Sequence, residues 1–139
     1  MKSKLITYPN GLKECYLNGK LHKEDGPAVE YHNGTKKWYL NGELHREDDH
    51  AVEYPDGTKK WYLNGKRHRI NGPAIERPDG LKAWYLNGEL HREDGPAIEH
   101  PDGTKEWYLN GKEYDKISYY ELMIKLGHMT EEDIFLELI

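Results

Sequence analysis

Trp38-Tyr39-Leu40-Asn41-Gly42 is one copy of a segment that returns along the chain at a fixed distance. Trp precedes Tyr-Leu-Asn-Gly in four copies, and Cys15 precedes it in the first. The copies are spaced 23 residues apart and begin at Tyr16, Tyr39, Tyr62, Tyr85 and Tyr108. Such self-similarity is typical of a repeat architecture, in which each unit is too small to bury its apolar face alone and stacks on its neighbours.

The composition of the 139-residue chain agrees with a thin, repetitive structure. Charged residues make up 32% and hydrophobic residues only 36%, whereas eleven Tyr and four Trp supply aromatic surface for cross-strand pairs. The net charge of −5 disfavours nucleic acid and anionic lipid as partners, because surfaces that bind them are usually basic. A single cysteine, with no signal peptide and no apolar span in the sequence, predicts a cytoplasmic protein that does not contact membranes.

Each unit is predicted to be a strand, a tight turn, a second strand, another tight turn and a short third strand. In the second copy, Asn33-Gly34 and Asn41-Gly42 separate segments of alternating polarity. Asn-Gly between such segments is the strongest short-range signal of a two-residue type I′ hairpin. Counting outward from these turns places Val29 opposite Trp38, and Trp38 opposite His45. This row is predicted to repeat along one face, with the Trp side chains stacked from unit to unit.

The predicted fold class is an all-β repeat protein. Residues 1–114 form an elongated antiparallel β-meander of about five hairpin units, and residues 115–139 form a small C-terminal helical cap. The first helix of the cap is expected to begin at the capping box Ser118-x-x-Glu121 and to end at Gly127. Thr130 is expected to cap a second helix. The expected apolar sides are Tyr120, Met123 and Ile124 on the first helix, and Ile134, Phe135, Leu138 and Ile139 on the second.

The two helices have two possible roles. A bare last hairpin would expose a strand edge, which proteins usually cover, so a lid over the C-terminal edge is the simpler interpretation. The alternative is an amphipathic partner-binding or dimerising helix. The oligomeric state stays open.

The pattern resembles the MORN repeat (membrane occupation and recognition nexus), and more closely its shorter bacterial and viral relatives. The resemblance covers about residues 5–114 and rests on the 23-residue period, the aromatic before the Asn-Gly turn (WYLNG) and the Gly-containing turn of each hairpin (PDG, HNG). The WYLNG-x-x-HREDGPA unit is similar to those of bacteriophage and large-virus reading frames. The resemblance implies a curved single sheet used for binding, and it suggests a phage-type inhibitor of a bacterial defence factor.

Two groups of residues have the types needed for chemistry. His22, His45, His68 and His91 recur beside carboxylate pairs, but we expect equivalent positions to lie too far apart to share one metal ion. Each His is expected to pack on a Trp and to hydrogen-bond backbone instead. Cys15 is predicted to face His22, but no oxyanion donor or third orienting residue accompanies the pair. No catalytic residue, metal ligand or cofactor is therefore predicted.

The function predicted from these observations is non-enzymatic binding of a protein partner through the repeated surface. If the Trp row is core, the exposed anchors belong to the opposite face, where the candidate binding residues are Tyr39, Tyr62, Tyr85, Lys37 and Lys60. The alternative is an enzyme or a small-ligand or metal-binding protein. Its site would lie under the C-terminal helices or at the irregular Asp48-Asp49-His50 junction, where Asp49 and His50 replace the Gly-Pro of the other junctions.

Overall fold

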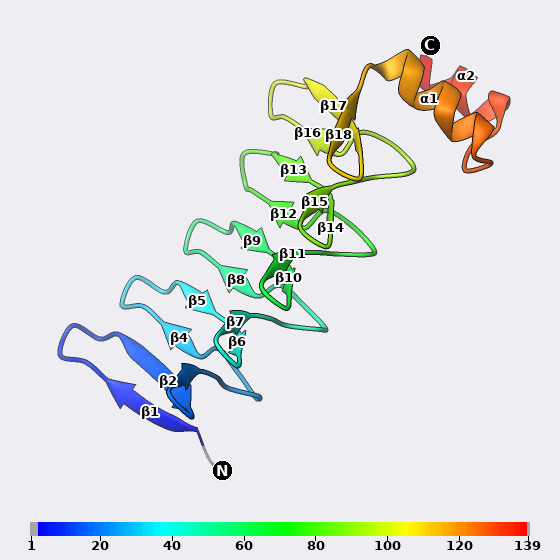
Figure 1. Cartoon of the computed structure of the whole chain (residues 1–139). Coiled ribbons are helices and arrows are strands. Elements are labelled where there is room, and N and C mark those ends of the chain that lie inside the picture. The colour runs from blue at the N-terminus through cyan, green and yellow to red at the C-terminus, as the bar shows by residue number, and fades with distance from the viewer. Residues whose placement is uncertain (1–2, 139) are drawn as a thin grey trace.

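The computed structural model describes residues 3–138 and shows an elongated array of β-hairpins with two helices at its C-terminal end (Figure 1). Successive units follow one another in a single direction, so the two termini lie at opposite ends of the molecule (Figure 1). The predicted fold class, an all-β repeat protein with a C-terminal helical cap, is confirmed.

One long antiparallel sheet extends along the whole array. Each unit contributes one hairpin to it, and each hairpin pairs with the hairpin of the next unit. Within residues 3–138 this sheet has 12 strands: β1 (Lys4–Thr7), β2 (Lys13–Leu17), β3 (Lys20–Leu21), β4 (Val29–Glu30), β5 (Lys36–Lys37), β8 (Val52–Glu53), β9 (Lys59–Lys60), β12 (Ile75–Glu76), β13 (Lys82–Ala83), β16 (Ile98–Glu99), β17 (Lys105–Leu109) and β18 (Lys112–Tyr114).

Smaller hairpins form a second row beside the long sheet (Figure 1). The expected three-strand meander therefore divides in the middle units, because the chain turns away from the long sheet at the Trp and pairs the next segment with the third strand. The separate hairpins are β6 (Tyr39–Leu40) with β7 (Glu43–Leu44), β10 (Tyr62–Leu63) with β11 (Lys66–Arg67), and β14 (Tyr85–Leu86) with β15 (Glu89–Leu90).

The first turn of each unit differs from the predicted type I′ turn. Tyr31 pairs with Thr35 around a three-residue loop, and Gly34 has positive φ whereas Asn33 does not. The Asn33 side chain accepts a hydrogen bond from the Thr35 amide (3.0 Å), which fixes the loop locally. The additional loop residue moves the register by one position, so Val29 lies opposite Lys37. The predicted pairing of Val29 with Trp38 is wrong.

The second turn is the predicted type I′ turn. Asn41 (φ 51°) and Gly42 (φ 81°) both have positive φ, and His45 pairs with Trp38 as expected. On its other side Trp38 reaches the next unit, where its amide donates to the Ala51 carbonyl (2.8 Å). The Trp residues therefore join consecutive units.

An aspartate in the first turn of a unit makes the stability of the fold depend on pH. Asp56 accepts a hydrogen bond from the Thr58 backbone amide, which lowers the pKa of the Asp56 carboxyl. A carboxyl whose pKa is lower in the folded state stabilises the fold above its unfolded pKa, and this contribution is lost as the pH falls through the folded value. Asn33 makes the same hydrogen bond without a charge.

We therefore expect Asp56→Asn to flatten the loss of stability between about pH 5 and pH 2, and Asn33→Asp to steepen it. Urea unfolding of the wild type and both variants across this range measures the slopes. Asn and Asp already occupy this position in different units, so neither substitution is expected to disturb the fold. Parallel curves for all three proteins would contradict this account of the turns.

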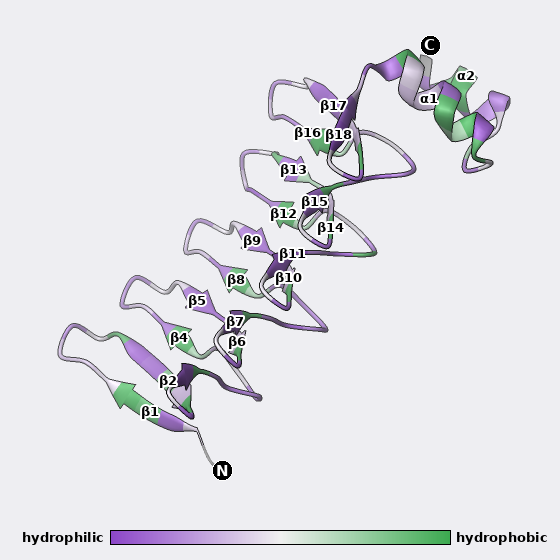
Figure 2. Ribbon diagram, viewed as in Figure 1, coloured by the Kyte–Doolittle hydropathy of each residue, from purple (hydrophilic) through white to green (hydrophobic). Residues whose placement is uncertain are grey.

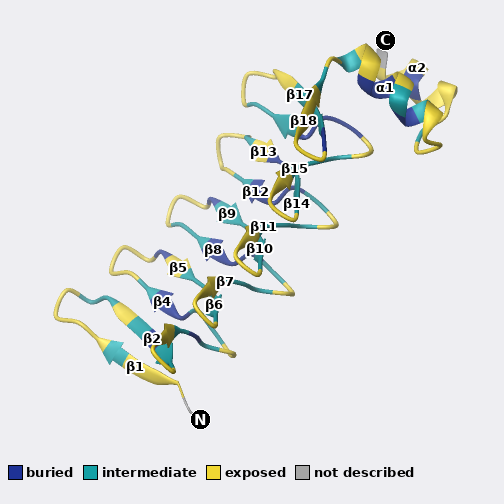
Figure 3. Cartoon of the chain, viewed as in Figure 1, coloured by how far each residue is buried: buried dark blue, intermediate teal, exposed yellow. Residues whose placement is uncertain are grey.

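Small and β-branched residues form the interior along the array. The buried positions recur once per unit at the start of each main hairpin, whereas the turns at the outer edge are exposed (Figure 3). Apolar positions coincide with them at β4, β8 and β12 (Figure 2). The recurring buried residues are Ala28, Val29, Ala51, Val52, Ala74, Ile75 and Ala97. This narrow interior explains how a chain with few apolar residues folds.

A compact cluster of larger side chains covers the C-terminal end. Helices α1 (Lys116–Lys125) and α2 (Glu131–Leu138) supply Tyr119, Tyr120, Met123 and Ile134, which pack on Leu109 of β17. The ring of Tyr120 also meets that of Trp107 edge-on at 6.3 Å between centroids. Among residues 3–138, no helix has the length and apolar character needed to cross a membrane.

The helices differ from expectation in two details. Asp115, not Ser118, is the N-cap of α1: its side chain accepts a hydrogen bond from the Ser118 amide (2.9 Å), so the helix begins earlier. Thr130 receives a hydrogen bond from the Asp133 amide, as a cap of α2 does. Ile134 is buried as expected, but Phe135 is 63% exposed, so its predicted packing is wrong. The Leu138 side chain and Ile139 lie outside the described residues.

Candidate functional site

Three hydrogen bonds join each second-row hairpin to the unit before it. The backbone amide of Asn41 donates a hydrogen bond to Nδ1 of His22 (3.0 Å), and the backbone amide of Gly42 donates one to the Leu21 carbonyl (2.8 Å). The Lys23 amide donates to the Tyr39 carbonyl (3.1 Å). In the following units, Nδ1 of the equivalent histidine accepts the same hydrogen bond from a backbone amide: His45 from Asn64, His68 from Asn87 and His91 from Asn110. The prediction that the histidines hydrogen-bond backbone is confirmed, and their role is to join units.

An arginine lies over each interior Trp. The guanidinium carbon of Arg69 is 3.8 Å from the Trp61 ring centroid, and Arg46 and Arg92 make the same contact with Trp38 (4.2 Å) and Trp84 (3.8 Å). Such cation–π contacts are attractive and hold the arginine side chain in place. The Trp row is thus partly open, with arginine rather than histidine over its rings. The sequence signal for this contact is the Arg directly after His in the HRED and HRI segments, a position for which the repeat pattern alone predicts no contact.

Consecutive junction loops enclose clefts along the Trp face. We call the three clefts together the loop groove, and number them from the N-terminus. Their volumes are about 740 Å³, 330 Å³ and 750 Å³. The first lies between loops 23–27 and 46–48, the second between 46–49 and 69–71, and the third between 69–72 and 92–94. Neighbouring clefts therefore share a wall.

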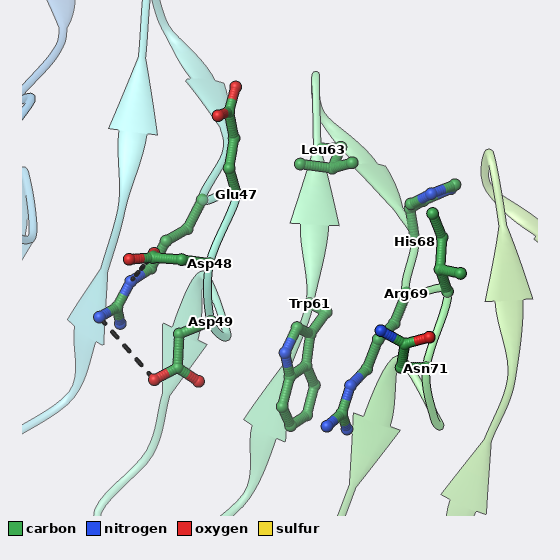
Figure 4. Close-up of a pocket in the computed structure, with 10 residues that line it drawn as sticks. Glu47, Asp48, Asp49, Trp61, Leu63, His68, Arg69 and Asn71 are labelled. Atoms are coloured by element: carbon green, nitrogen blue, oxygen red, sulfur yellow. Dashed lines mark ion pairs between the residues drawn. The ribbon is translucent and has the colours of Figure 1, made fainter.

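Each cleft is lined by one tryptophan, one leucine and several charged side chains. In the second cleft, Asp48 and Asp49 lie on one side and Trp61 and Arg69 on the other, with Leu63 at the upper end (Figure 4). The dashed lines mark the ion pairs of Arg46 with the two aspartates, at 3.5 Å and 3.9 Å. The equivalent residues line the other two clefts: Trp38 and Leu40 in the first, and Trp84 and Leu86 in the third.

The balance of charge changes along the loop groove. The first cleft is lined by two basic and four acidic side chains (Lys23, Arg46; Glu24, Asp25, Glu47, Asp48). The second has two basic and three acidic side chains (Arg46, Arg69; Glu47, Asp48, Asp49). The third has two of each (Arg69, Arg92; Glu93, Asp94). Counting His as neutral, the clefts carry −2, −1 and 0, so the groove is most acidic at its N-terminal end.

The third junction departs from the other loops. Ile70 and Asn71 stand where the other junctions have Glu and Asp, and Ile70 is 79% exposed. Ile70 lines both the second and the third cleft. Arg69, without an acidic neighbour in its loop, pairs with Glu76 of the long sheet (3.1 Å). An exposed apolar side chain therefore stands in an otherwise acidic row of loops.

The predicted tyrosine and lysine residues form a second repeated surface, on the opposite face from the Trp row. Tyr39, Tyr62 and Tyr85 are half-buried, and burial raises the pKa of Tyr39. Arg67 donates to the Tyr62 hydroxyl (3.3 Å) and lies 5.4 Å from the centre of the Tyr85 ring. Lys37 and Lys60 lie over the rings of Tyr31 and Tyr54, at 5.4 Å and 5.3 Å. Many tyrosine rings and basic side chains of this surface therefore contact one another.

At the irregular Asp48-Asp49-His50 junction, Asp49 and His50 pack against each other. Asp49 accepts hydrogen bonds from both the amide and the Nδ1 of His50, each at 2.8 Å, and the amide in particular lowers the pKa of the Asp49 carboxyl. The imidazole meets the Trp38 and Trp61 rings edge-on, at 5.9 Å and 5.6 Å. Its buried Nε2 has no hydrogen-bond partner in residues 3–138, and a carboxylate oxygen of Glu53 lies 3.7 Å from it. His50 thus fills the place of the junction prolines.

The space under the C-terminal helices is occupied by side chains. Tyr119 is fully buried; its hydroxyl donates to the Arg92 carbonyl and accepts from the Gly95 amide (3.2 Å). Tyr120 and Met123 fill the remainder against Leu109. Across the described residues, no three His, Cys, Asp or Glu side chains converge as a metal site would require.

The chain matches no protein-family model, and a search of curated proteins finds no match either.

Proposed function

We propose that this protein binds a protein partner without catalysing a reaction, and that the loop groove is its contact surface. The observation that supports the proposal is the repetition of one type of cleft between four consecutive junction loops, with each of the three clefts built from two units. A specific protein interface covers about 800 Å² on each partner, so such a contact would extend over more than one cleft and onto the loops around them. Trp and Arg, which line every cleft, are the residues enriched at interface hot spots.

The proposal has narrower parts that rest on sequence alone. A cytoplasmic location follows from the composition and the lone cysteine. Membership of a MORN-like repeat family, and the idea that the partner is a bacterial defence factor, rest on the resemblance of the 23-residue unit. The half-buried Tyr39, Tyr62 and Tyr85 offer a second surface, so the binding experiment must separate the two faces.

The test is a pull-down with purified protein and host lysate, followed by reconstitution with the purified partner. Glu47→Lys/Asp48→Lys reverses two exposed charges in the loop groove, and Lys37→Glu/Lys60→Glu reverses two on the tyrosine face. We expect the groove variant to lose about tenfold or more in affinity, roughly 1.4 kcal/mol, while the tyrosine-face variant retains the partner. Circular dichroism of both variants controls for folding.

The opposite result has a defined meaning. Loss of the partner only in Lys37→Glu/Lys60→Glu would move the contact to the tyrosine face. A partner retained equally by both variants would contradict binding through the repeated surfaces. If His45→Phe abolished the biological effect while fold and partner binding stayed intact, the enzyme or metal hypothesis would replace the proposal.

A further inference from the structure

We infer that the loop groove accepts a polyproline II peptide with three residues per cleft, basic toward the N-terminal clefts and apolar beside Ile70. This inference rests on the proposed function and names the conformation and chemistry of the bound segment.

The spacing of the clefts selects the conformation of the ligand. Each unit contributes two strands to the long sheet, so equivalent clefts repeat about every 9.6 Å. A polyproline II helix has three residues per turn and rises about 3.1 Å per residue, so one side of it repeats about every 9.3 Å. In an extended strand, by contrast, side chains on one face repeat about every 6.6–6.8 Å. Of these two periods, that of polyproline II places an equivalent side chain in each cleft.

The tryptophan and leucine residues that line the clefts also suit a polyproline II peptide. Polyproline II has no internal hydrogen bonds, so its carbonyls need outside donors, and aromatic-lined grooves are the usual receptors for it. The indole nitrogen of Trp61 faces the side of the second cleft that Asp48 and Asp49 form (Figure 4). Leu63 adds an apolar contact at one end of that cleft. The first and third clefts are also lined by a tryptophan and a leucine, Trp38 with Leu40 and Trp84 with Leu86.

The charges of the walls define the order of side chains in the peptide. The carboxylates of Glu24, Glu47 and Asp48 are 84–89% exposed, and they line the two N-terminal clefts. Basic side chains of a ligand would meet them there. The third cleft is balanced in charge and bordered by the exposed Ile70. An apolar side chain is therefore favoured at that end, and a uniformly basic peptide is not the best match.

The first experiment compares peptides of equal charge by titration calorimetry. Pro-Pro-Arg repeated three times presents one Arg per cleft in polyproline II form, whereas Gly-Gly-Arg repeated three times has the same charge without that conformation. We expect the proline peptide to bind about tenfold more tightly, because less conformational entropy is lost on binding. Equal affinity for the two peptides would overturn the inference, since it would reduce the groove to a general acidic surface.

The second experiment uses the third junction. Ile70→Glu/Asn71→Asp gives this loop the Glu-Asp of the other junctions and so fits the fold. The wild type is expected to prefer Pro-Pro-Arg-Pro-Pro-Arg-Pro-Pro-Leu or its reverse over the all-Arg peptide. The variant is expected to reverse that preference, changing the ratio of the two affinities about tenfold. The matched control, Glu24→Ile/Asp25→Asn, places the third-junction residues in the first loop and should weaken both peptides.

The outcomes separate this inference from the proposed function. An unchanged ratio in Ile70→Glu/Asn71→Asp would overturn the assignment of the apolar end. A partner that is lost by Glu47→Lys/Asp48→Lys, while the proline and glycine peptides bind alike, would leave the proposed function in place and remove the polyproline inference.

Discussion

Truncation after Tyr114 is expected to abolish the cooperative unfolding of the protein and to cause aggregation. The shortened chain loses Tyr119, Tyr120, Met123 and Ile134, which are all buried against the last unit. Burial of one large apolar side chain stabilises a fold by about 1.5–3 kcal/mol. The loss of this packing is therefore comparable to the whole stability of a small domain, about 5–15 kcal/mol.

The truncated chain also exposes an edge. Without α1, the rings of Trp107 and Tyr114 lose their cover, and the Gly95 amide loses the Tyr119 hydroxyl. Terminal units of repeat proteins need a cap for this reason.

Size-exclusion chromatography and thermal unfolding monitored by circular dichroism measure the effect of truncation. The control is Phe135→Ser/Leu136→Ser, which changes two side chains that are 63% and 67% exposed and should leave stability nearly unchanged. A truncated chain that stays monomeric and unfolds at the wild-type temperature would show that the helices serve another purpose, such as partner binding.

Trp61→Ala is expected to destabilise the protein by about 3 kcal/mol. Trp61 packs against the Arg69 guanidinium on its ring and the edge of His50, and its amide bonds the Ala74 carbonyl of the next unit. Because the indole is half-buried, we expect a value at the lower end of the usual range for Trp→Ala. The substitution keeps this backbone hydrogen bond but removes a side chain that contacts two consecutive junctions, at His50 and Arg69, so the unfolding transition should also broaden.

Urea unfolding followed by circular dichroism measures both the midpoint and the slope of the transition. The control is Tyr31→Ala on the other face, where the ring is 41% exposed and its charged contact is Lys37 at 5.4 Å; a loss below about 1 kcal/mol is expected there. A Trp61→Ala loss no larger than that of Tyr31→Ala would mean that the Trp row contributes little to the stacking of units.

The sequence by itself determined the repeat and the second turn of each unit. Five Asn-Gly dipeptides at a fixed spacing predict type I′ turns, because both residues accept positive φ, and all five form in the structure. Turn conformation depends on a few neighbouring residues, so it can be predicted locally. The first turn of each unit is not the predicted type I′ turn, although the sequence contains a signal for the observed loop. Pro55-Asp56-Gly57 has Pro, a side-chain acceptor and then Gly, which is the order that suits a three-residue loop.

The tertiary structure decided how the units contact one another. The one-residue change in register moved Val29 opposite Lys37 and left the Trp38 amide to pair with the Ala51 carbonyl of the next unit. The loop groove exists only because consecutive loops come together when units stack, so its walls combine residues far apart in the sequence, such as Asp48 and Asn71. The hydrogen bond from the Tyr119 hydroxyl to the Arg92 carbonyl also joins residues far apart in the sequence. A period predicts that units stack, whereas side-chain packing between them sets which atoms meet.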